Sequence, residues 1–200
     1  MSTWACAATG GLRLNRASGK SMASLLLHTC CAPCATYCVQ HWRQKGLAVT
    51  ILWYNPNIHP FTEHRQRLES LQSLAQKENI PLIVAEGYDV IAYFRAVVGH
   101  EKERCGYCFR LRLSMAALIA KLRGFDAFST TLLISPYQDQ PLLKEVGEEM
   151  AAKQGVSFLY EDLRPGFEES HKVSRELGLY RQKYCGCLYS EWERFGKVKI

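Results

Sequence analysis

Short apolar runs alternate with amphipathic stretches along almost the whole chain. Runs rich in β-branched and aromatic residues, typical of buried strands, occupy residues 24–28, 48–54, 81–85, 125–130 and 156–160. Between them, apolar residues recur at helical spacing, which predicts helices at 34–45, 61–77, 90–97, 105–121, 142–154 and 188–195 and a short one within 166–178. Strands that alternate with helices predict an α/β fold, with a Rossmann-like, mostly parallel sheet, right-handed crossovers and helices on both faces.

The pattern divides the chain into a short tail and one domain. Residues 1–23 are rich in Gly, Ala and Ser without periodicity, which predicts a disordered tail or an extension from an upstream start codon, with Met22 as the natural start. Cys6 lies in this tail and is expected to have no role. Residues 24–200 contain no repeats and no linker, which predicts a single α/β catalytic domain. No stretch resembles a signal peptide or a membrane span, so we expect a cytoplasmic protein without a membrane partner.

Nine cysteines are the strongest chemical signal in the sequence. A chain of this length folds without disulfides or zinc, and cytosolic cysteine clusters more often mean metal binding or catalysis. The strand at 24–28 runs into Cys30 and Cys31, so both thiols are expected at the carboxyl end of the first strand, where α/β sheets bind ligands. Cys34 either belongs to this site or simply starts the helix, and Cys38 is better explained as a small core residue.

Cys105 and Cys108 form a Cys-x-x-Cys motif at the start of a predicted helix, a position where both sulfurs can bind one metal. With Cys30 and Cys31 they complete four thiolates, a count that suits zinc and a [4Fe–4S] cluster equally. Adjacent ligands are strained on one tetrahedral zinc, whereas a cluster offers a separate iron to each sulfur. We therefore favour a cysteine-rich iron–sulfur site at the carboxyl ends of the strands.

Cys185 and Cys187 flank Gly186 near the end of the chain. A disulfide between them would close a very small, strained ring, and such disulfides have relatively oxidising potentials. The pair therefore suits electron passage or oxidant sensing better than structural cross-linking. The alternative is that the two thiolates hold a second iron beside the cluster.

The chain resembles the cobalamin-independent epoxyqueuosine reductases of the QueH type. The resemblance runs from about residue 25 to residue 190 and rests on five motifs in order, which are LHTCCAPC, YNPNIHP, RCGYCFRLRL, STTLLISPYQD and YRQKYCGC. Any one of these motifs is a weak signal, but the paired cysteines, the Cys-x-x-Cys motif and YRQKYCGC together are specific.

The resemblance implies an oxidoreductase that reduces the epoxide of epoxyqueuosine to queuosine at the wobble position of tRNA. It implies a [4Fe–4S] cluster bound by Cys30, Cys31, Cys105 and Cys108 and a redox-active pair at Cys185 and Cys187. The implied partners are tRNA and an electron donor that the sequence does not identify. Removal of an epoxide oxygen takes two electrons and two protons, and the candidate proton donors near the cysteines are His28, His59, Tyr107 and Tyr184.

The charge of the chain adds only local support for an RNA substrate. The net charge is +6, from 25 basic and 19 acidic residues, of which Arg13, Arg16 and Lys20 lie in the tail and leave +3 for the rest. Arg181 and Gln182 are candidates for binding phosphate or a base edge. Two basic clusters with interleaved aromatic residues suit a stacked, extruded base: Arg104/Arg110/Arg112 and Lys172/Arg175/Arg181/Lys183, with Tyr107, Phe109, Tyr180 and Tyr184. Ordinary helix-surface charge with core aromatics is the alternative.

Two other classes of protein remain as alternatives. A structural zinc protein acting as an RNA-binding module would use the same cysteines without redox chemistry. An α/β tRNA-thiolating enzyme would share the fold and the substrate, but it needs a phosphate-binding SGGxDS-type loop after the first strand. HTCCAPC stands at that place instead, which argues against ATP binding.

Overall fold

A five-stranded, fully parallel sheet forms the centre of the molecule. The computed structural model describes residues 22–200, and the tail predicted for residues 1–23, including Cys6, lies almost entirely outside the described residues. The strand order is β3-β2-β1-β4-β5. The strands are β1 (Ser24–His28), β2 (Ala48–Trp53), β3 (Leu82–Val84), β4 (Ala127–Thr130) and β5 (Ser157–Phe158). The predicted parallel sheet is confirmed.

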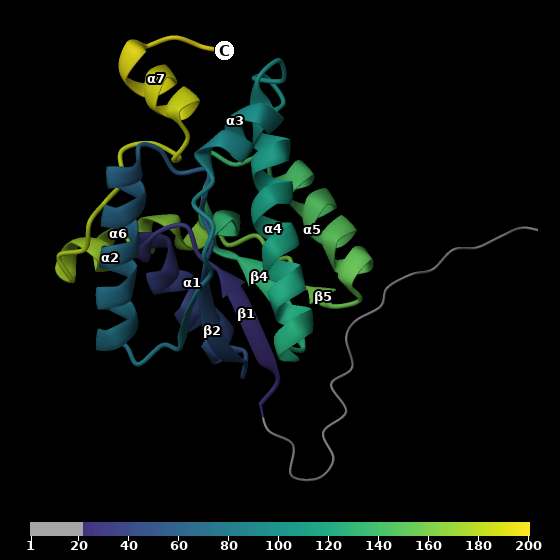
Figure 1. Ribbon diagram of the computed structural model, residues 1–200. Helices are drawn as coiled ribbons and strands as arrows, with labels where there is room; N and C mark the ends of the chain where they lie inside the picture. Colours follow the sequence, from purple (N-terminus) through teal and green to yellow (C-terminus); the bar gives the residue numbers. More distant parts are fainter. Residues whose placement is uncertain (1–21) are drawn as a thin grey trace, which may run out of the picture.

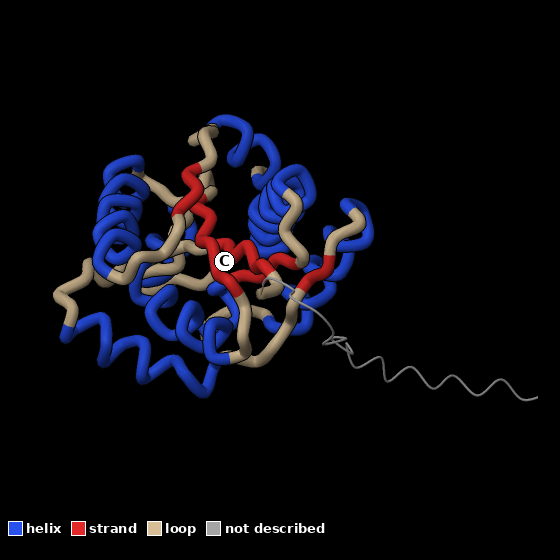
Figure 2. The backbone as a smooth tube through the Cα atoms, turned by 90° about the horizontal axis from the view of Figure 1, so that it is seen from below, coloured by secondary structure: helices blue, strands red, loops and turns tan. Residues whose placement is uncertain are grey.

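Helices cover both faces of this sheet, as predicted. Helices α1, α2 and α6 pack together on one face, and α4 and α5 pack against each other on the other face (Figures 1 and 2). Helix α7 stands clear of these layers (Figure 1). The helices are α1 (Ala32–Gln44), α2 (Phe61–Lys77), α3 (Val90–Val97), α4 (Arg104–Arg123), α5 (Gln140–Gln154), α6 (Phe167–Glu176) and α7 (Leu188–Gly196), with short 3-10 helices at Thr131–Ile134 and Arg164–Gly166.

Local chemistry explains where these elements begin and how they are buried. Three successive leucines, Leu25–Leu27, are all fully buried in β1, because helices cover both faces of a parallel sheet. The side chain of Asp139 accepts a hydrogen bond of 3.0 Å from the backbone N–H of Leu142, so α5 begins at Gln140, two residues earlier than the periodicity predicts. Helix α1 likewise starts early, at Ala32, because Pro33 is tolerated in a first helical turn.

The strand order places a ligand site between β1 and β4. From β1 the chain continues to β2 on one side of the sheet, and from β4 it continues to β5 on the other side. Folds of the α/β class bind ligands at the carboxyl ends of two adjacent strands whose connections diverge in this way. Cys30 and Cys31 follow β1 there, and Thr131 follows β4. No helix in the described part of the chain has the length and hydrophobicity needed to traverse a lipid bilayer.

His28 ends β1 and is completely buried beside this point. Its Nδ1 lies 2.9 Å from the hydroxyl of Thr130 and its Nε2 lies 3.3 Å from the carbonyl oxygen of Tyr54, so Nε2 carries the proton. Burial, and then the positive charge of Arg112, lower the pKa of His28 from 6.5 to about 4. The imidazole is therefore neutral near pH 7 and joins β1, β2 and β4.

This burial predicts that the protein loses stability on mild acidification. Unfolded His28 takes up a proton near pH 6.5, whereas the folded protein protonates it only near pH 4, so the unfolded state binds more protons between these values. The stabilisation is complete above pH 6.5 and is lost as the pH falls towards 4, by on the order of 3 kcal/mol for His28. Urea unfolding from pH 7 to 4.5 measures it, and a His28→Gln variant should show a flatter curve. Parallel curves for the two proteins would contradict the assignment.

Candidate metal centre

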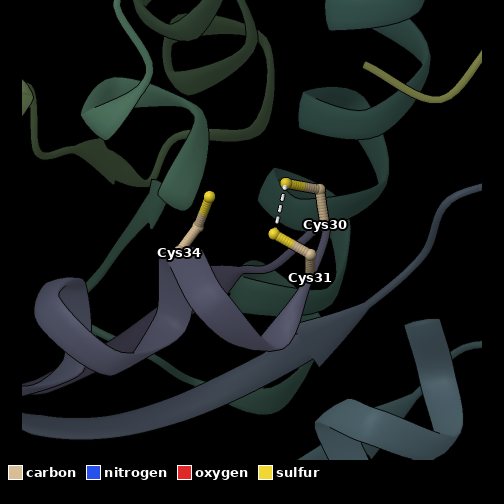
Figure 3. A group of neighbouring side chains, drawn as sticks. All are labelled: Cys30, Cys31 and Cys34. Atoms are coloured by element: carbon tan, nitrogen blue, oxygen red, sulfur yellow. Dashed lines mark hydrogen bonds between the residues drawn. The ribbon is translucent and has the colours of Figure 1, made fainter. Parts of the chain in front are cut away.

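Three cysteine thiols converge at the turn between β1 and α1. The Sγ atoms of Cys30, Cys31 and Cys34 all lie within 4.8 Å of one another, and those of Cys30 and Cys31 are 3.8 Å apart. Figure 3 shows the three side chains directed towards the same region, from the turn and from the first turn of α1. Cys34 thus belongs to the site, whereas Cys38 is fully buried among core residues, as expected.

Neighbouring groups make the three thiols chemically unequal. The hydrogen bonds that Cys30 shares with Cys31 and Cys34, supported by the charge of Arg112, hold the pKa of Cys30 well below its usual range. The same sharing raises the pKa values of Cys31 and Cys34. The Sγ atom of Cys30 also lies 3.7 Å from the hydroxyl oxygen of Thr131, which follows β4. One thiolate is therefore readily formed here, and a bound cation would stabilise the others.

Cys105 and Cys108 lie in the first turns of α4, where the sequence predicts them. Cys105 is exposed and Cys108 is buried. Cys108 packs with Tyr93, Val97 and Cys187 in a small cluster separate from the main core. Among the described residues, neither Cys105 nor Cys108 belongs to the group of thiols within 4.8 Å of one another.

Cys185 links the two groups of thiols. Its segment reaches both of the others, since Gln182 donates a hydrogen bond of 3.0 Å to the thiol of Cys31 and Cys187 packs with Cys108, so all three predicted cysteine segments meet at one end of the sheet. Cys185 is an exposed residue, and its thiol accepts a hydrogen bond of 3.5 Å from the side-chain amide of Gln138. Cys185 and Cys187 are both free thiols in the structure, so no disulfide joins them.

Arg112 supplies positive charge inside this group. It lies one turn after Cys108 on α4, and its side chain is 1% exposed. Its Nε donates to the carbonyl oxygen of Cys108 at 3.2 Å, while its Nη2 has no hydrogen-bond partner among residues 22–200. Burial alone would lower its pKa, but the nearby thiols outweigh burial when they ionise and raise it: Cys108, Cys185, Cys30 and Cys105. Burial in turn raises the pKa values of Cys105, Cys108 and Cys185, so these three thiols ionise only with help from a nearby cation.

These observations test whether the site fits a metal cluster bound by thiolates. Such a group carries net negative charge, and thiolates buried at low dielectric need a compensating cation. A buried guanidinium with a free N–H, surrounded by thiols from three segments, meets that need. The residues therefore fit an anionic metal–thiolate centre, although they do not by themselves distinguish zinc from iron and sulfide.

A second buried guanidinium holds the segment that carries Cys185 and Cys187. Arg67 on α2 donates from Nη1 to the carbonyl oxygen of Cys185 at 2.9 Å and from Nη2 to that of Tyr184 at 3.1 Å. Its Nε donates to Glu63 at 2.7 Å, and Glu63 also accepts the hydroxyl of Tyr180 at 2.6 Å. The planar guanidinium makes these three hydrogen bonds at once, a geometry that the single ammonium group of lysine cannot reproduce.

Gly186 lets the same segment approach the loop after β2. The backbone N–H of His59 donates to the carbonyl oxygen of Gly186 at 2.7 Å. Gly186 has a φ of +151°, and a Cβ atom there would lie 3.0 Å from the side chain of Ile58. Next to it, the Cys187 thiol accepts the backbone N–H of Ser190 at 3.4 Å and caps α7. The positions of both thiols are therefore set by their neighbours.

Replacement of Arg67 by lysine should destabilise the protein by about 2 kcal/mol, because it removes charge-assisted hydrogen bonds in a buried position. It should also make Cys185 react faster with iodoacetamide, since the backbone around it is released. Urea unfolding and the rate of alkylation measure the two effects. Arg65→Lys is the matched control on the same helix, because Arg65 pairs with Glu69 on the surface. Equal behaviour of the two variants would contradict the role given to Arg67.

The structure corrects part of the predicted RNA-binding set. Arg112 and Arg104 are buried, and Arg104 pairs with Glu193 at 2.5 Å, so this cluster is not a solvated basic surface. Phe109 is 1% exposed and belongs to the core, because it faces inward from α4. Gln182 donates to the thiol of Cys31 at 3.0 Å instead of being free to bind a base. The second cluster is exposed as predicted: Lys172, Arg175, Arg181 and Lys183.

Two of the proposed proton donors, both histidines, are in the neutral form, which donates a proton poorly. Burial lowers the pKa of His59 to about 4, as it does for His28, so both are neutral near pH 7.

The sequence analysis did not identify Arg67 as a functional residue, nor the role of Arg112. The spacing along each helix could have indicated them. Arg67 follows Glu63 by four residues in α2, and Arg112 follows Cys108 by four residues in α4, a spacing at which side chains on one helix interact.

Comparisons with known proteins agree with the cysteine pattern. A family model described as epoxyqueuosine reductase QueH matches residues 25–193. The epoxyqueuosine reductase QueH of Dehalococcoides mccartyi is 44% identical over 173 residues, which span 86% of this chain and 95% of that protein. The protein of the same description from Thermotoga maritima is 34% identical over 182 residues, which span 86% and 93%.

A solved structure shows the same fold in a distant protein. It is the predicted subunit of tRNA methyltransferase from Methanocaldococcus jannaschii, with a TM-score of 0.52 and 9% sequence identity over 76% of this chain and 75% of that chain. At that identity the likeness concerns the fold alone.

Proposed function

The chain belongs to the QueH family of epoxyqueuosine reductases, and from this premise we propose that it reduces the epoxide of epoxyqueuosine in tRNA to queuosine, the last step of queuosine biosynthesis. The observation that carries the proposal is the meeting of three distant cysteine segments around the buried charge of Arg112. Such a centre suits electron transfer next to a substrate. A structural zinc site would not require an exposed thiol such as Cys185 beside it.

The proposed cofactor is a [4Fe–4S] cluster with Cys30, Cys31, Cys105 and Cys108 as its ligands. The Sγ atom of Cys34 lies within 4.8 Å of those of Cys30 and Cys31, so Cys34 is the alternative ligand from α1. When bound, the cluster would supply electrons of low potential one at a time. The chain itself contributes the charge of Arg112 and the N–H···S hydrogen bond from Gln182 to Cys31, both of which stabilise negative charge on the sulfurs.

The reaction removes the epoxide oxygen as water and leaves a carbon–carbon double bond. It consumes two electrons and two protons, which is also what a pair of thiols releases when it closes to a disulfide. Cys185 and Cys187 are the proposed redox-active pair, and an external electron donor of low potential would reduce them again. Cys185 is the more accessible residue of the pair and would meet the substrate, while Cys187 is buried beside Cys108.

A second iron held by Cys185 and Cys187 is the alternative role for the pair. The interactions of Cys185 with both groups of thiols are compatible with either account. In both, Arg67 and Gly186 would hold the two thiols in place, and the substrate would enter on the side where Cys185 is exposed.

The first test of the proposal is conversion of the substrate by protein reconstituted anaerobically with iron and sulfide. We expect tRNA that carries epoxyqueuosine to yield queuosine, as measured by mass spectrometry of its nucleosides, when a low-potential reductant is present. Cys31→Ala and Cys108→Ala should lose most of the iron and all conversion, because each removes a thiolate ligand.

Cys38→Ala is the control for these variants, because Cys38 is a core cysteine outside the metal site and its loss should leave the iron bound. Loss of iron in Cys34→Ala with full iron in Cys108→Ala would replace Cys108 by Cys34 in the ligand set. A colourless protein with stoichiometric zinc and no conversion would favour the structural zinc alternative.

The role of the second pair is tested by Cys185→Ala and Cys187→Ala. If the pair is redox-active, both variants should keep the full iron content of the wild type yet stop turnover, since the four cluster ligands remain. A thiol titration of the oxidised wild type should then find two thiols fewer than that of the reduced protein. Loss of one iron per chain in either variant would instead favour the second iron, and full activity in both variants would reject both roles.

A further inference from the structure

Helix α7 turns its apolar side to solvent. Leu188, Trp192 and Phe195 follow one another at spacings of four and three residues, so they lie on one face of the helix. Their side chains are 48%, 53% and 54% exposed, and no residue of α7 is buried. In a helix of a globular protein this face normally packs on the core, so an outward apolar stripe indicates a surface that binds something.

A neighbouring side of α7 packs on the body of the molecule. Glu193 pairs with Arg104 at the start of α4, at 2.5 Å. The ring of Tyr189 lies 6.2 Å from that of Phe94 on α3 and 5.7 Å from the guanidinium of Arg104. Tyr189 and Glu193 hold one side of the helix to the body, and the ring of Phe195 lies 6.5 Å from that of Tyr184, yet the three residues of the stripe remain 48–54% exposed. Figure 1 shows α7 projecting beyond the layers around the sheet.

Trp192 is arranged as a flat platform. Gly196 lies one turn further along the helix, and a Cβ atom built on it would come within 2.8 Å of the indole ring. The ring therefore lies close to Gly196, and the side chain of Trp192 is 53% exposed. A planar ring held in this way loses little entropy when another planar group stacks on it.

The charge around the stripe is positive. Residues 181–200 contain five basic and two acidic residues, and one of the acids, Glu193, is already paired with Arg104. The basic residues are Arg181, Lys183, Arg194, Lys197 and Lys199, all of them exposed. A second copy of the chain would bring the same positive charge against itself, whereas a polyanion would be attracted.

The stripe begins at the proposed active site. Helix α7 starts immediately after Cys187, and at 1.5 Å per residue Phe195 lies about 12 Å along the helix from it. Successive stacked nucleotides are spaced by about 3.4 Å, so this length corresponds to a few nucleotides of a single strand. A strand that places one base at Cys185 would thus run along α7 with its neighbours.

We propose that the stripe of Leu188, Trp192 and Phe195 is a stacking surface for unpaired nucleotides next to the modified base, with the surrounding lysines and arginines binding their phosphates. The inference rests on the proposed function, in which tRNA is the substrate. Exposed aromatic rings beside basic residues are how proteins hold single-stranded RNA. The sequence suggested Phe109 as a stacking residue, but Phe109 is buried in the core. The stripe would provide the stacking surface instead.

The test measures binding of a labelled tRNA transcript with guanosine at the wobble position to the full, reconstituted protein by fluorescence anisotropy. Trp192→Ala should weaken binding roughly tenfold, because base–aromatic stacking is lost. Trp192→Phe should restore most of the affinity. RNA should also quench tryptophan emission in the wild type and do so much less in Trp192→Phe, an effect that a purely structural role of Trp192 would not produce.

Leu122→Ala is the matched control, because Leu122 is an exposed apolar residue at the far end of α4 from Arg104. It should bind RNA as the wild type does, and iron content should be the same in all variants. Unchanged affinity and quenching in Trp192→Ala would overturn the proposal. A wild-type dimer that dissociates in Trp192→Ala, with RNA affinity unchanged, would also overturn it and assign the stripe to a second copy.

The same experiment separates this surface from the reaction. If Trp192→Ala weakens RNA binding while the wild type fails to convert epoxyqueuosine, the RNA-binding surface is supported and the proposed reaction is contradicted. If the wild type converts epoxyqueuosine in tRNA and Trp192→Ala raises neither the KM for tRNA nor the Kd, the proposed reaction is supported and the RNA-binding surface is contradicted.

Discussion

The negative charge that thiolates bring into the interior of the protein is the constraint on which the rest of the site depends. Thiols from three segments meet at one end of the sheet, and several of them must be ionised to hold a metal. Burying an anion costs much free energy unless a cation lies close to it, and Arg112 is the buried cation here. Its partners come from the turn after β1, from α4 and from the loop before α7, so one guanidinium ties the three segments together electrostatically.

The fold brings these segments together through its strand order. Because β1 lies between β2 and β4, the turn that carries Cys30 and Cys31 borders both the loop after β2 and the end of β4. The loop after β2 leads into α2, from which Arg67 reaches the backbone of Cys185, and its own charge also acts on Cys31. Two arginines thus serve different purposes. Arg112 balances charge, and Arg67 fixes a backbone.

Helix α7 joins the chemistry to the surface. Its first turn is capped by Cys187, and its remaining length presents rings and positive charge to solvent. A substrate that is a macromolecule needs contacts beyond the reacting group, and binding energy from such remote contacts can position the reacting group. The arrangement of α7 next to the thiols is consistent with that requirement.

The sequence by itself determined the order of strands and helices, and the placement of Cys30 and Cys31 at a strand end and of Cys105 and Cys108 at a helix start. These features are local, because periodicity and turn chemistry depend on neighbouring residues. Only the tertiary structure decided that Arg112 is buried among thiols, that Gln182 reaches Cys31 from 151 residues away, and that α7 turns its apolar side outward. A pattern of apolar residues identifies a face but not what covers it, and long-range partners depend on how the strands are ordered in the sheet.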